Sequence, residues 1–347
     1  MSDDARAKQL GVTKMGLLFA ALACCTVTLT IGNKFILKNW EYESTLLVIQ
    51  CGSTVLILLA CSLLRSVFGD GLPGWVPTMK PLSLQQFKVY IVASVFVTVQ
   101  LITSLYGLPL VTIATVTVFQ NLRTIATAIF ESVLLREMFS VRVLLALCVT
   151  IGGSVVYGLC DRRPGGNYDA TGYFWMFANV IAAVVAALVY RKFNPSVNQT
   201  GWGIALIENA NMLPVFAVLA MRETGAVTAL IDADRSIWGA LVMTSLAGTL
   251  IGSCYANCYK YAAATSVAVA ATTNKCIAIV IGLFFFHKSL APIQWLALVV
   301  IIVGGMWFGF ERKAEQNSKK DAQQQLGELT SKVEYTGVGG EEQDLVP

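Results

Sequence analysis

Two cations within apolar stretches of the chain are the residues best placed to do chemistry. Arg123 lies near the centre of the apolar run 111–134, and Lys275 lies near the centre of the run 265–286. On insertion-derived scales each cation would cost about 2.5–3.5 kcal/mol at the centre of a bilayer if it faced lipid. A cavity, an anionic partner or an anionic ligand must therefore offset roughly 5–7 kcal/mol. We expect the two cations to bind an anionic substrate in the middle of the membrane.

Amide side chains stand directly beside both cations. Gln120 and Asn121 precede Arg123, and Asn274 precedes Lys275. Cations bind phosphate, whereas amides recognise hydroxyl groups and the edges of heterocycles through paired donors and acceptors. A carbohydrate alone would not require the cations, and an inorganic ion alone would not require the amides. The combination predicts a ligand that carries phosphate together with a sugar or a base.

Further polar residues interrupt other apolar runs. Glu208 and Asn209 lie together in the run 202–221. A carboxylate there could accept hydrogen bonds from an N–H-rich edge such as that of guanine. Four more residues are expected to complete the wall of the site: Asn33, Lys34, Ser253 and Asn257.

An ion pair within the chain is the alternative explanation for the two cations. Glu131 lies two turns from Arg123 in the same apolar run, and Glu208 lies in a different run. Either carboxylate could neutralise a buried cation and so remove the need for a ligand. The sequence leaves this alternative open, more so for Arg123 than for Lys275.

The sequence carries no signature of an enzyme or of a metal site. It contains no GxSxG, HExxH or Walker pattern and no pair of carboxylates placed for hydrolysis. The single histidine, His287, is expected to be a solvated residue at a helix end. The nine cysteines lack the spacing of zinc ligands and of secreted disulfide frameworks. We therefore expect a protein that is not an enzyme and that uses no metal or cofactor.

The composition sets the fold class. Of the 347 residues, 56% are hydrophobic and only 13% are charged, against roughly 25% charged in soluble domains. Lipid offers no hydrogen-bond partners to backbone polar groups, so long apolar runs must form helices.

The basic residues are scattered among short loops, which argues against nucleic-acid binding. Ten runs are long enough to cross a bilayer: 15–37, 44–64, 86–107, 111–134, 141–160, 172–190, 202–221, 236–258, 265–286 and 291–310.

An internal repeat divides these runs into two halves. Arg123 and Lys275 are 152 residues apart, and the same offset relates Gly152-Gly153 to Gly304-Gly305. Two features at one separation predict two halves of five helices, and an odd number of helices places the halves in opposite orientations. The glycine pairs are expected to let helices approach closely, and a homodimer formed through them is the alternative.

The predicted architecture is an all-α polytopic membrane protein with ten transmembrane helices in two inverted five-helix repeats. Counted as far as Lys320, the segments facing the side of the N-terminus hold fifteen Lys and Arg residues against seven in the opposite loops, so the positive-inside rule places both termini in the cytosol. The expected segments are a cytosolic N-terminal segment 1–14, the first repeat 15–160, a lumenal loop 161–171, the second repeat 172–312 and a disordered cytosolic tail 313–347.

Four short motifs resemble those of the nucleotide-sugar transporters of the drug/metabolite transporter superfamily, most of all the Golgi GDP-mannose transporter branch. Residues 119–123, Phe-Gln-Asn-Leu-Arg, resemble the FKNLT motif of that family. Residues 271–275, Ala-Thr-Thr-Asn-Lys, resemble its GALNK motif, and residues 206–209, Leu-Ile-Glu-Asn, resemble its FYNN motif. Residues 33–35, Asn-Lys-Phe, resemble its NKF motif. The resemblance spans nearly all of the ten-helix region, roughly 15–312.

The resemblance implies a membrane antiporter that works by alternating access. A cytosolic nucleotide sugar, GDP-mannose by preference, would enter the Golgi lumen as the nucleoside monophosphate GMP leaves. Asparagines of the FYNN type are associated with the base and the GALNK segment with phosphate and sugar, so these roles would pass to Asn209, Asn274 and Lys275. The chain departs from the family at Gln120, where FKNLT has its lysine, and at Glu208, where FYNN has its first asparagine.

Three other functions stay open on the sequence alone. A UDP-sugar transporter would share most of these motifs. A phosphate-ester exchanger, such as a triose-phosphate or phosphoenolpyruvate carrier, would also use Lys and Arg on phosphate. A membrane scaffold or an intramembrane enzyme would bind no such ligand. The endoplasmic reticulum is the alternative to the Golgi membrane as the location.

Overall fold

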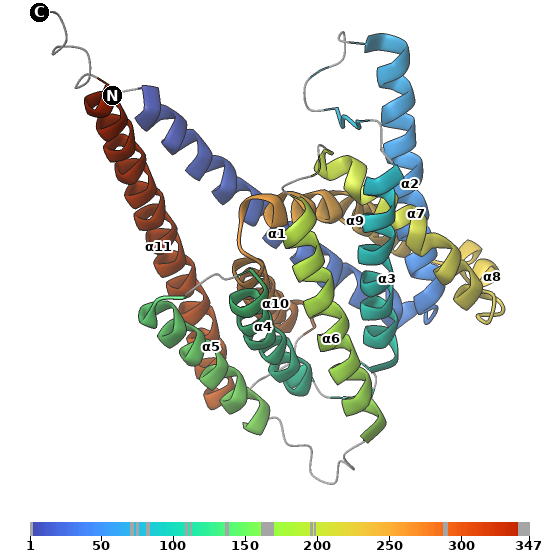
Figure 1. Cartoon of the computed structure of the whole chain (residues 1–347). Coiled ribbons are helices and arrows are strands. Elements are labelled where there is room, and N and C mark those ends of the chain that lie inside the picture. The colour runs from blue at the N-terminus through green and yellow to red at the C-terminus, as the bar shows by residue number, and fades with distance from the viewer. Residues whose placement is uncertain are drawn as a thin grey trace, which may run out of the picture.

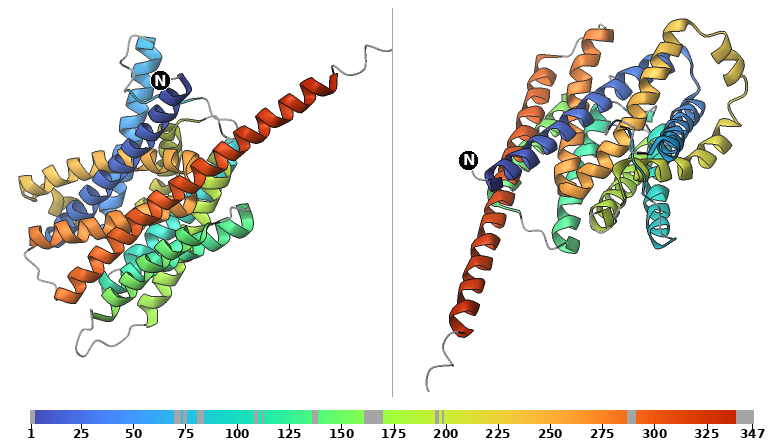
Figure 2. Two further views of the ribbon diagram at one scale, coloured as in Figure 1. Left: turned by 90° about the vertical axis from the view of Figure 1, so that its left-hand side faces the viewer. Right: turned by 90° about the horizontal axis from the view of Figure 1, so that it is seen from above.

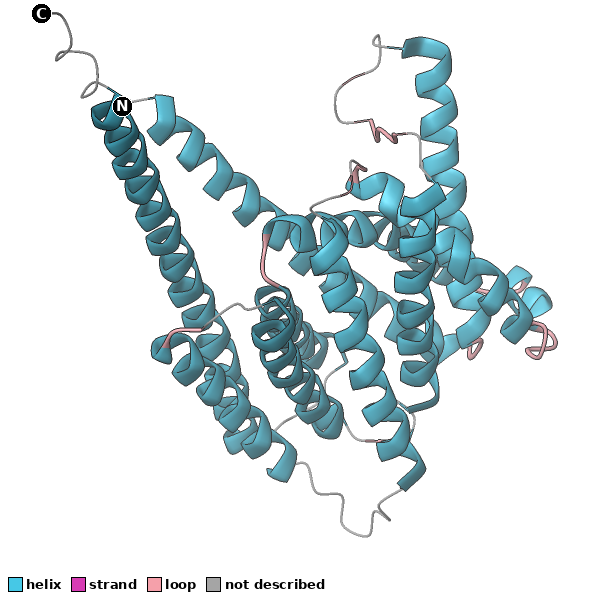
Figure 3. Ribbon diagram, in the orientation of Figure 1, coloured by secondary structure: helices cyan, strands magenta, loops and turns pink. Residues whose placement is uncertain are grey.

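The computed structural model describes most of the chain, with short gaps (Figure 1). The described residues are 3–69, 73, 76–80, 84–107, 110–111, 113–135, 139–160, 170–194, 197, 199–286 and 291–338. Every regular element within these ranges is a helix, and none is a strand (Figure 3). Most of the loop 161–171, the end of the tail beyond 338 and His287 lie outside the described residues.

The helices follow one another with short connections. In chain order they are α1 Asp3–Asn39, α2 Glu43–Phe68, α3 Leu84–Gly107, α4 Ile113–Leu135, α5 Val141–Cys160, α6 Ala170–Phe193, α7 Gly201–Ala220, α8 Ala226–Ile231, α9 Arg235–Tyr261, α10 Ala264–Phe286 and α11 Pro292–Val338.

Nine helices of the described chain are long and apolar enough to cross a membrane. They match nine of the ten predicted runs; the run 141–160, for example, forms α5 with the same bounds. The remaining run, 111–134, forms α4, which is not among the nine. The short helix α8, six residues long, was not predicted and cannot span a bilayer.

The outer surface of the bundle is apolar. Leu56, Val133 and Phe310 leave 70%, 69% and 68% of their surface exposed. In water such a surface would aggregate, whereas in lipid it needs no cover. The all-helical fold and this surface are those of a polytopic membrane protein.

Both ends of the helical region extend beyond the predicted spans. The first predicted span begins at residue 15, but α1 already begins at Asp3. It also predicts a disordered tail over 313–347, but α11 continues to Val338. The residues after Arg312 are rich in Ala, Glu, Lys, Gln and Leu, which are strong helix formers, and the preceding span supplies the helix nucleus. The C-terminal part of α11 projects away from the other helices (Figure 2).

The helices pack in pairs that are distant in sequence. α5 lies along α11, α1 along α9, α3 along α6 and α2 along α7. α4 and α10 contact each other, and α4 also packs on α5 and α6, while α10 packs on α1 and α11 (Figure 1). α4 therefore packs on three helices while its outer side, with Val133, stays exposed, and its charged residues Arg123 and Glu131 are buried, as charge within a membrane requires.

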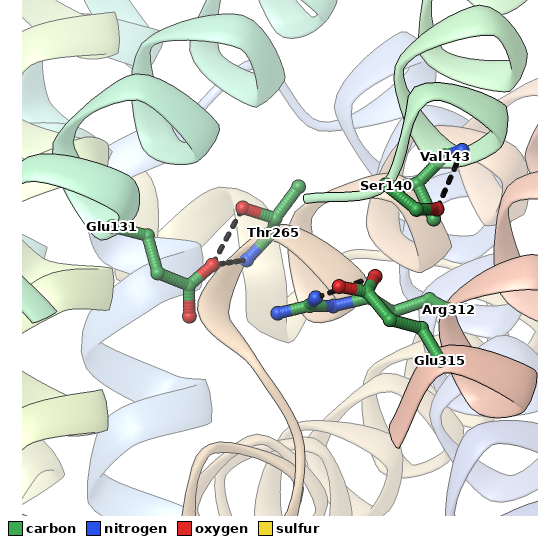
Figure 4. A network of polar contacts seen from close by, with 6 residues as sticks. All are labelled: Glu131, Ser140, Val143, Thr265, Arg312 and Glu315. Carbon is green, nitrogen blue, oxygen red and sulfur yellow. Dashed lines mark hydrogen bonds and ion pairs between the residues drawn. The ribbon is translucent and has the colours of Figure 1, made fainter. Parts of the chain in front are cut away.

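Glu131, in the last turns of α4, is bound to the beginning of α10 (Figure 4). Its fully buried carboxylate accepts hydrogen bonds from the backbone N–H groups of Ala264 at 2.6 Å and Thr265 at 2.8 Å. The Thr265 hydroxyl donates a third bond at 2.6 Å, and Arg191 Nε lies 3.9 Å away. The first N–H groups of a helix have no partners in their own helix, so a carboxylate there satisfies them and complements the helix dipole.

Glu223 does the same for the beginning of α2. It accepts hydrogen bonds from the N–H groups of Ser44 at 2.8 Å and Thr45 at 2.9 Å, and from the Thr45 hydroxyl at 2.7 Å. Burial raises the pKa of the Glu223 carboxyl, but the hydrogen bonds from Thr45 and Ser44 outweigh it and hold the pKa below its ordinary value. This contribution to stability is therefore present at neutral pH and is lost as the pH falls through the lowered pKa.

Glycines let α5 and α11 approach closely, as their pairing in the sequence predicts. A Cβ atom on Gly304 would lie 2.6 Å from Thr150 Oγ1 and 3.0 Å from the Thr150 backbone nitrogen. A Cβ atom on Gly153 would lie 3.0 Å from side-chain atoms of Ile301. In contrast, Gly152 has nothing within 4 Å of the place where its Cβ atom would lie.

Gly304→Ala should therefore destabilise the protein, and Gly152→Ala should not. The first change forces α5 and α11 apart, with a cost of about 1–3 kcal/mol for overpacking. The second adds a methyl group in open space, and the better helix propensity of alanine makes the change neutral or stabilising by up to about 1 kcal/mol. Thermal unfolding in detergent measures both variants. Equal melting temperatures for the two would show that this contact does not hold the helices together.

Candidate functional site

A cavity of about 310 Å³ lies inside the bundle, lined by residues of α1, α2, α3, α4, α6, α7 and α9. Much of the wall is apolar and contributed by small side chains such as Ala183, Ala186 and Gly252. The polar groups on the wall are few, as in most small-molecule sites. They are Asn33, Gln50, Thr54, Gln100, Arg123, Tyr190, Glu208, Asn209, Tyr255 and Tyr259.

Among the described residues that line the cavity, Arg123 carries the positive charge. It lies in the middle of α4 and is only 9% exposed, and its guanidinium lies close to Tyr255 and Tyr259. Its Nε is buried without a hydrogen-bond partner. A buried donor without a partner costs about 1–3 kcal/mol, which an anionic ligand in the cavity would recover.

The alternative that the sequence leaves open, an ion pair between Arg123 and Glu131, is not found among the described contacts. Glu131 is occupied by Ala264, Thr265 and Arg191, as described above. About two turns of helix separate the two residues along α4, so Arg123 lies on the cavity wall while Glu131 reaches the beginning of α10.

Glu208 and Asn209 enter the cavity from α7. Thr200 caps this helix by accepting a hydrogen bond from the Gly203 N–H group at 3.2 Å, which fixes its start at Gly201, seven residues before Glu208. Glu208 lies close to the hydroxyl group of Tyr190 on α6. Asn209 donates to the Ala205 carbonyl oxygen at 2.8 Å, so its amide is held against its own helix.

Three stacked tyrosines form one side of the cavity, and the sequence did not single them out. The rings of Tyr190 and Tyr259 are 5.8 Å apart and within 14° of parallel. The rings of Tyr255 and Tyr259 are 6.2 Å apart and within 21° of parallel. Tyr255 and Tyr259 are four residues apart on α9, a spacing that places them on one face of the helix. That spacing was visible in the sequence, but the partner Tyr190 comes from another helix.

The structure brings together four of the predicted site residues and separates others from them. Asn33, Arg123, Glu208 and Asn209 line the cavity. The other described residues do not line it: Lys34, Gln120, Asn121, Ser253, Asn257 and Asn274. The side chain of Lys275 lies outside the described part of the chain.

Hydrogen bonds show what three of the predicted site residues contact within the protein. Asn121 donates to the Ser154 hydroxyl group and so joins α4 to α5. Asn257 donates to the Ser253 carbonyl oxygen at 2.9 Å within α9. Asn33 accepts from Gln50 Nε2 at 2.7 Å at the edge of the cavity, which links α1 to α2.

Within the described residues, no group of three or more His, Cys, Asp or Glu side chains is placed to hold a metal ion. The chemistry of the wall is that of a binding site, with a cation, a carboxylate, amides and aromatic rings around a space of ligand size.

The chain is similar to curated transporters over most of its length. It is 25% identical to the GDP-mannose transporter GONST1 of Arabidopsis thaliana, over 86% of this chain and 90% of that protein. It is 23% identical to a GDP-mannose transporter of Kluyveromyces lactis, over 86% and 91% of the two chains. It is 22% identical to GDP-fucose transporter 1 of Arabidopsis thaliana, over 88% and 89%. These relatives are transporters rather than enzymes.

A solved structure also shares the fold. A crystal structure whose description names no function superposes with a TM-score of 0.61 at 15% identity, covering 87% of this chain and 98% of the other. No protein-family model matches the chain. By sequence and over more than four fifths of its length, the chain resembles the GDP-mannose branch of the nucleotide-sugar transporters.

Proposed function

We propose that this protein carries GDP-mannose or a related GDP-sugar into the Golgi lumen in exchange for GMP. The observation that carries the proposal is the cavity, where the buried guanidinium of Arg123 lies with Glu208, Asn209 and stacked tyrosines. A cation suits phosphate, a carboxylate and an amide suit the edge of a base, and aromatic rings offer a stacking surface. The relatives named as GDP-mannose and GDP-fucose transporters support the choice of a GDP-sugar.

Alternating access through two inverted halves is the proposed mechanism. Counting α4 as a span and leaving out α8 gives ten spans, and the second five would begin with α6. The counterparts are then α1 and α6, α2 and α7, α3 and α9, α4 and α10, and α5 and α11. If each span is replaced by its counterpart, the contact of α1 with α9 becomes the contact of α6 with α3, which is also observed. The same replacement turns α2 with α9 into α7 with α3, α1 with α10 into α6 with α4, and α4 with α5 into α10 with α11. A contact pattern that repeats in this way supports an inverted repeat around a shared site.

Exchange in proteoliposomes tests the function directly. Vesicles that contain the purified protein and are loaded with GMP should take up labelled GDP-mannose faster than vesicles without GMP, because the shared guanine nucleotide part binds in both directions. Uptake of UDP-sugars against UMP instead would assign the protein to UDP-sugars. Uptake of phosphate esters with no effect of any nucleotide would make it a phosphate-ester exchanger. If none of these compounds raises the melting temperature of the protein, the remaining interpretation is a membrane scaffold that binds no such ligand.

Arg123→Gln should weaken GDP-mannose binding by about 10- to 100-fold, the value of one charge-assisted hydrogen bond. The loss follows if the guanidinium contacts phosphate, and it is measured as a shift in Kd. Arg222→Gln is the matched control, because Arg222 is exposed between α7 and α8 and lies away from the cavity wall. Equal affinities for both variants would remove Arg123 from the site. Lys275, on α10, stays a proposed phosphate ligand, and Lys275→Ala tests it in the same assay.

Both termini are proposed to face the cytosol, on the distribution of Lys and Arg. The single glycosylation sequon, Asn198-Gln199-Thr200, would then lie on the cytosolic side and carry no glycan. Glycosidase treatment of the protein expressed in eukaryotic cells should leave its electrophoretic mobility unchanged. A faster-migrating band after treatment would reverse the proposed orientation.

A further inference from the structure

Glu208 is a carboxylate in the middle of a membrane-spanning helix, without a described cation to balance it. α7 contains no other charged residue between Gly201 and Ala220. The side chain is half-buried and lines the cavity. Among the described residues, no Lys or Arg nitrogen lies within the 4.0 Å of an ion pair with Glu208. An ionised carboxylate in such surroundings is costly unless a partner compensates it.

The groups that face Glu208 come from every helix around it. They are Cys51 on α2, Tyr90 on α3 and Tyr190 on α6, while Arg123 on α4 and the pair Tyr255 and Tyr259 on α9 share the same cavity. Thiols and phenols in water lose their protons only above about pH 8, and a guanidinium keeps its charge throughout. Glu208 is therefore the group on this wall that can exchange a proton with its surroundings while the thiol, the phenols and the guanidinium keep theirs.

A guanine base would change the balance at Glu208. Its N1–H and N2–H groups are adjacent donors, and a carboxylate can accept both of them side by side, whereas a protonated carboxyl group would oppose one of them with its own O–H. Donors from the ligand therefore favour the ionised form in the filled cavity, and burial favours the protonated form in the empty cavity.

We propose that Glu208 is a proton site coupled to substrate: it holds a proton in the empty cavity and releases it when a ligand presents two adjacent N–H groups. The inference rests on the proposed function, because it takes that ligand to be a guanine nucleotide. The O–H bond of the carboxyl group breaks, the proton leaves to water through the cavity, and two N–H···O hydrogen bonds replace it. Both exchanged nucleotides carry the same base, so a complete exchange cycle moves no net proton.

The coupling makes affinity depend on the pH of the side that the cavity faces. At the more acidic side the empty, protonated site is favoured, so that the nucleotide is released more readily there. At the less acidic side the nucleotide is bound more tightly. A pH difference across the membrane would thus set the affinities on the two sides without driving transport.

Calorimetric titration of the full-length protein with GDP-mannose tests the coupling. GDP-mannose is the probe because the terminal phosphate of GMP itself titrates near pH 6. The Kd should fall with rising pH, by up to about tenfold per pH unit, and binding measured in two buffers of different ionisation heat should release up to about one proton. Glu208→Gln should abolish the proton release, whereas Glu208→Asp, which keeps a carboxylate, should retain it. Glu41→Gln, which changes an exposed carboxylate outside the cavity, should match the wild type.

The outcomes separate the two proposals. GDP-mannose binding with no proton release at any pH between about 5.5 and 8 would overturn the role of Glu208 and leave the proposed function standing. Proton release that persists in Glu208→Gln would assign it to another group and also overturn the role. Absence of GDP-mannose binding in the wild type would instead remove the proposed function, and the coupling with it. If Glu208→Gln does not fold, the wild type and Glu208→Asp still decide the question.

Discussion

The cost of placing charge in a membrane governs this structure. Lipid cannot solvate a guanidinium or a carboxylate, so Arg123 and Glu208 must be enclosed by other helices or meet a ligand. The bundle does enclose them: α4 is packed on α5, α6 and α10, and α7 on α2, α3 and α9. The apolar side chains on the outside have no such requirement. The interior cavity and the apolar surface are therefore two consequences of one constraint.

The same constraint explains how the helix ends are held. Glu131 and Glu223 each satisfy the free N–H groups at the beginning of another helix, α10 in one case and α2 in the other. Glu131 does so in the fully buried interior and Glu223 at a part-buried site, and each joins segments that are far apart in sequence. Glu131 therefore fixes where α10 begins relative to α4, the helix that carries Arg123.

Hydropathy was sufficient to predict the long helices. It did not predict the direction in which each side chain points. Arg123 and Asn121 are neighbours in sequence, yet two positions along a helix rotate a side chain by about 200°. Arg123 consequently faces the cavity while Asn121 binds Ser154 on α5. The stacked tyrosines escaped prediction for a related reason, since Tyr190 and Tyr259 meet only once α6 and α9 are in place. Helix α11 exceeded its predicted span because helix propensity continues where hydropathy ends.

The presence of both a cation and a carboxylate on one cavity wall restricts the ligand more than either charge does alone. A small phosphate ester would use Arg123 but would bring Glu208 no N–H donors, so it would leave the carboxyl group of Glu208 without a partner from the ligand. A neutral sugar would leave the buried Nε of Arg123 without a partner. A ligand with phosphate at one end and an N–H-rich base at the other satisfies both groups at once. Under the proposed function, Glu208, where the chain departs from the FYNN motif that it resembles, is thus the residue that would distinguish a guanine nucleotide from a phosphate ester.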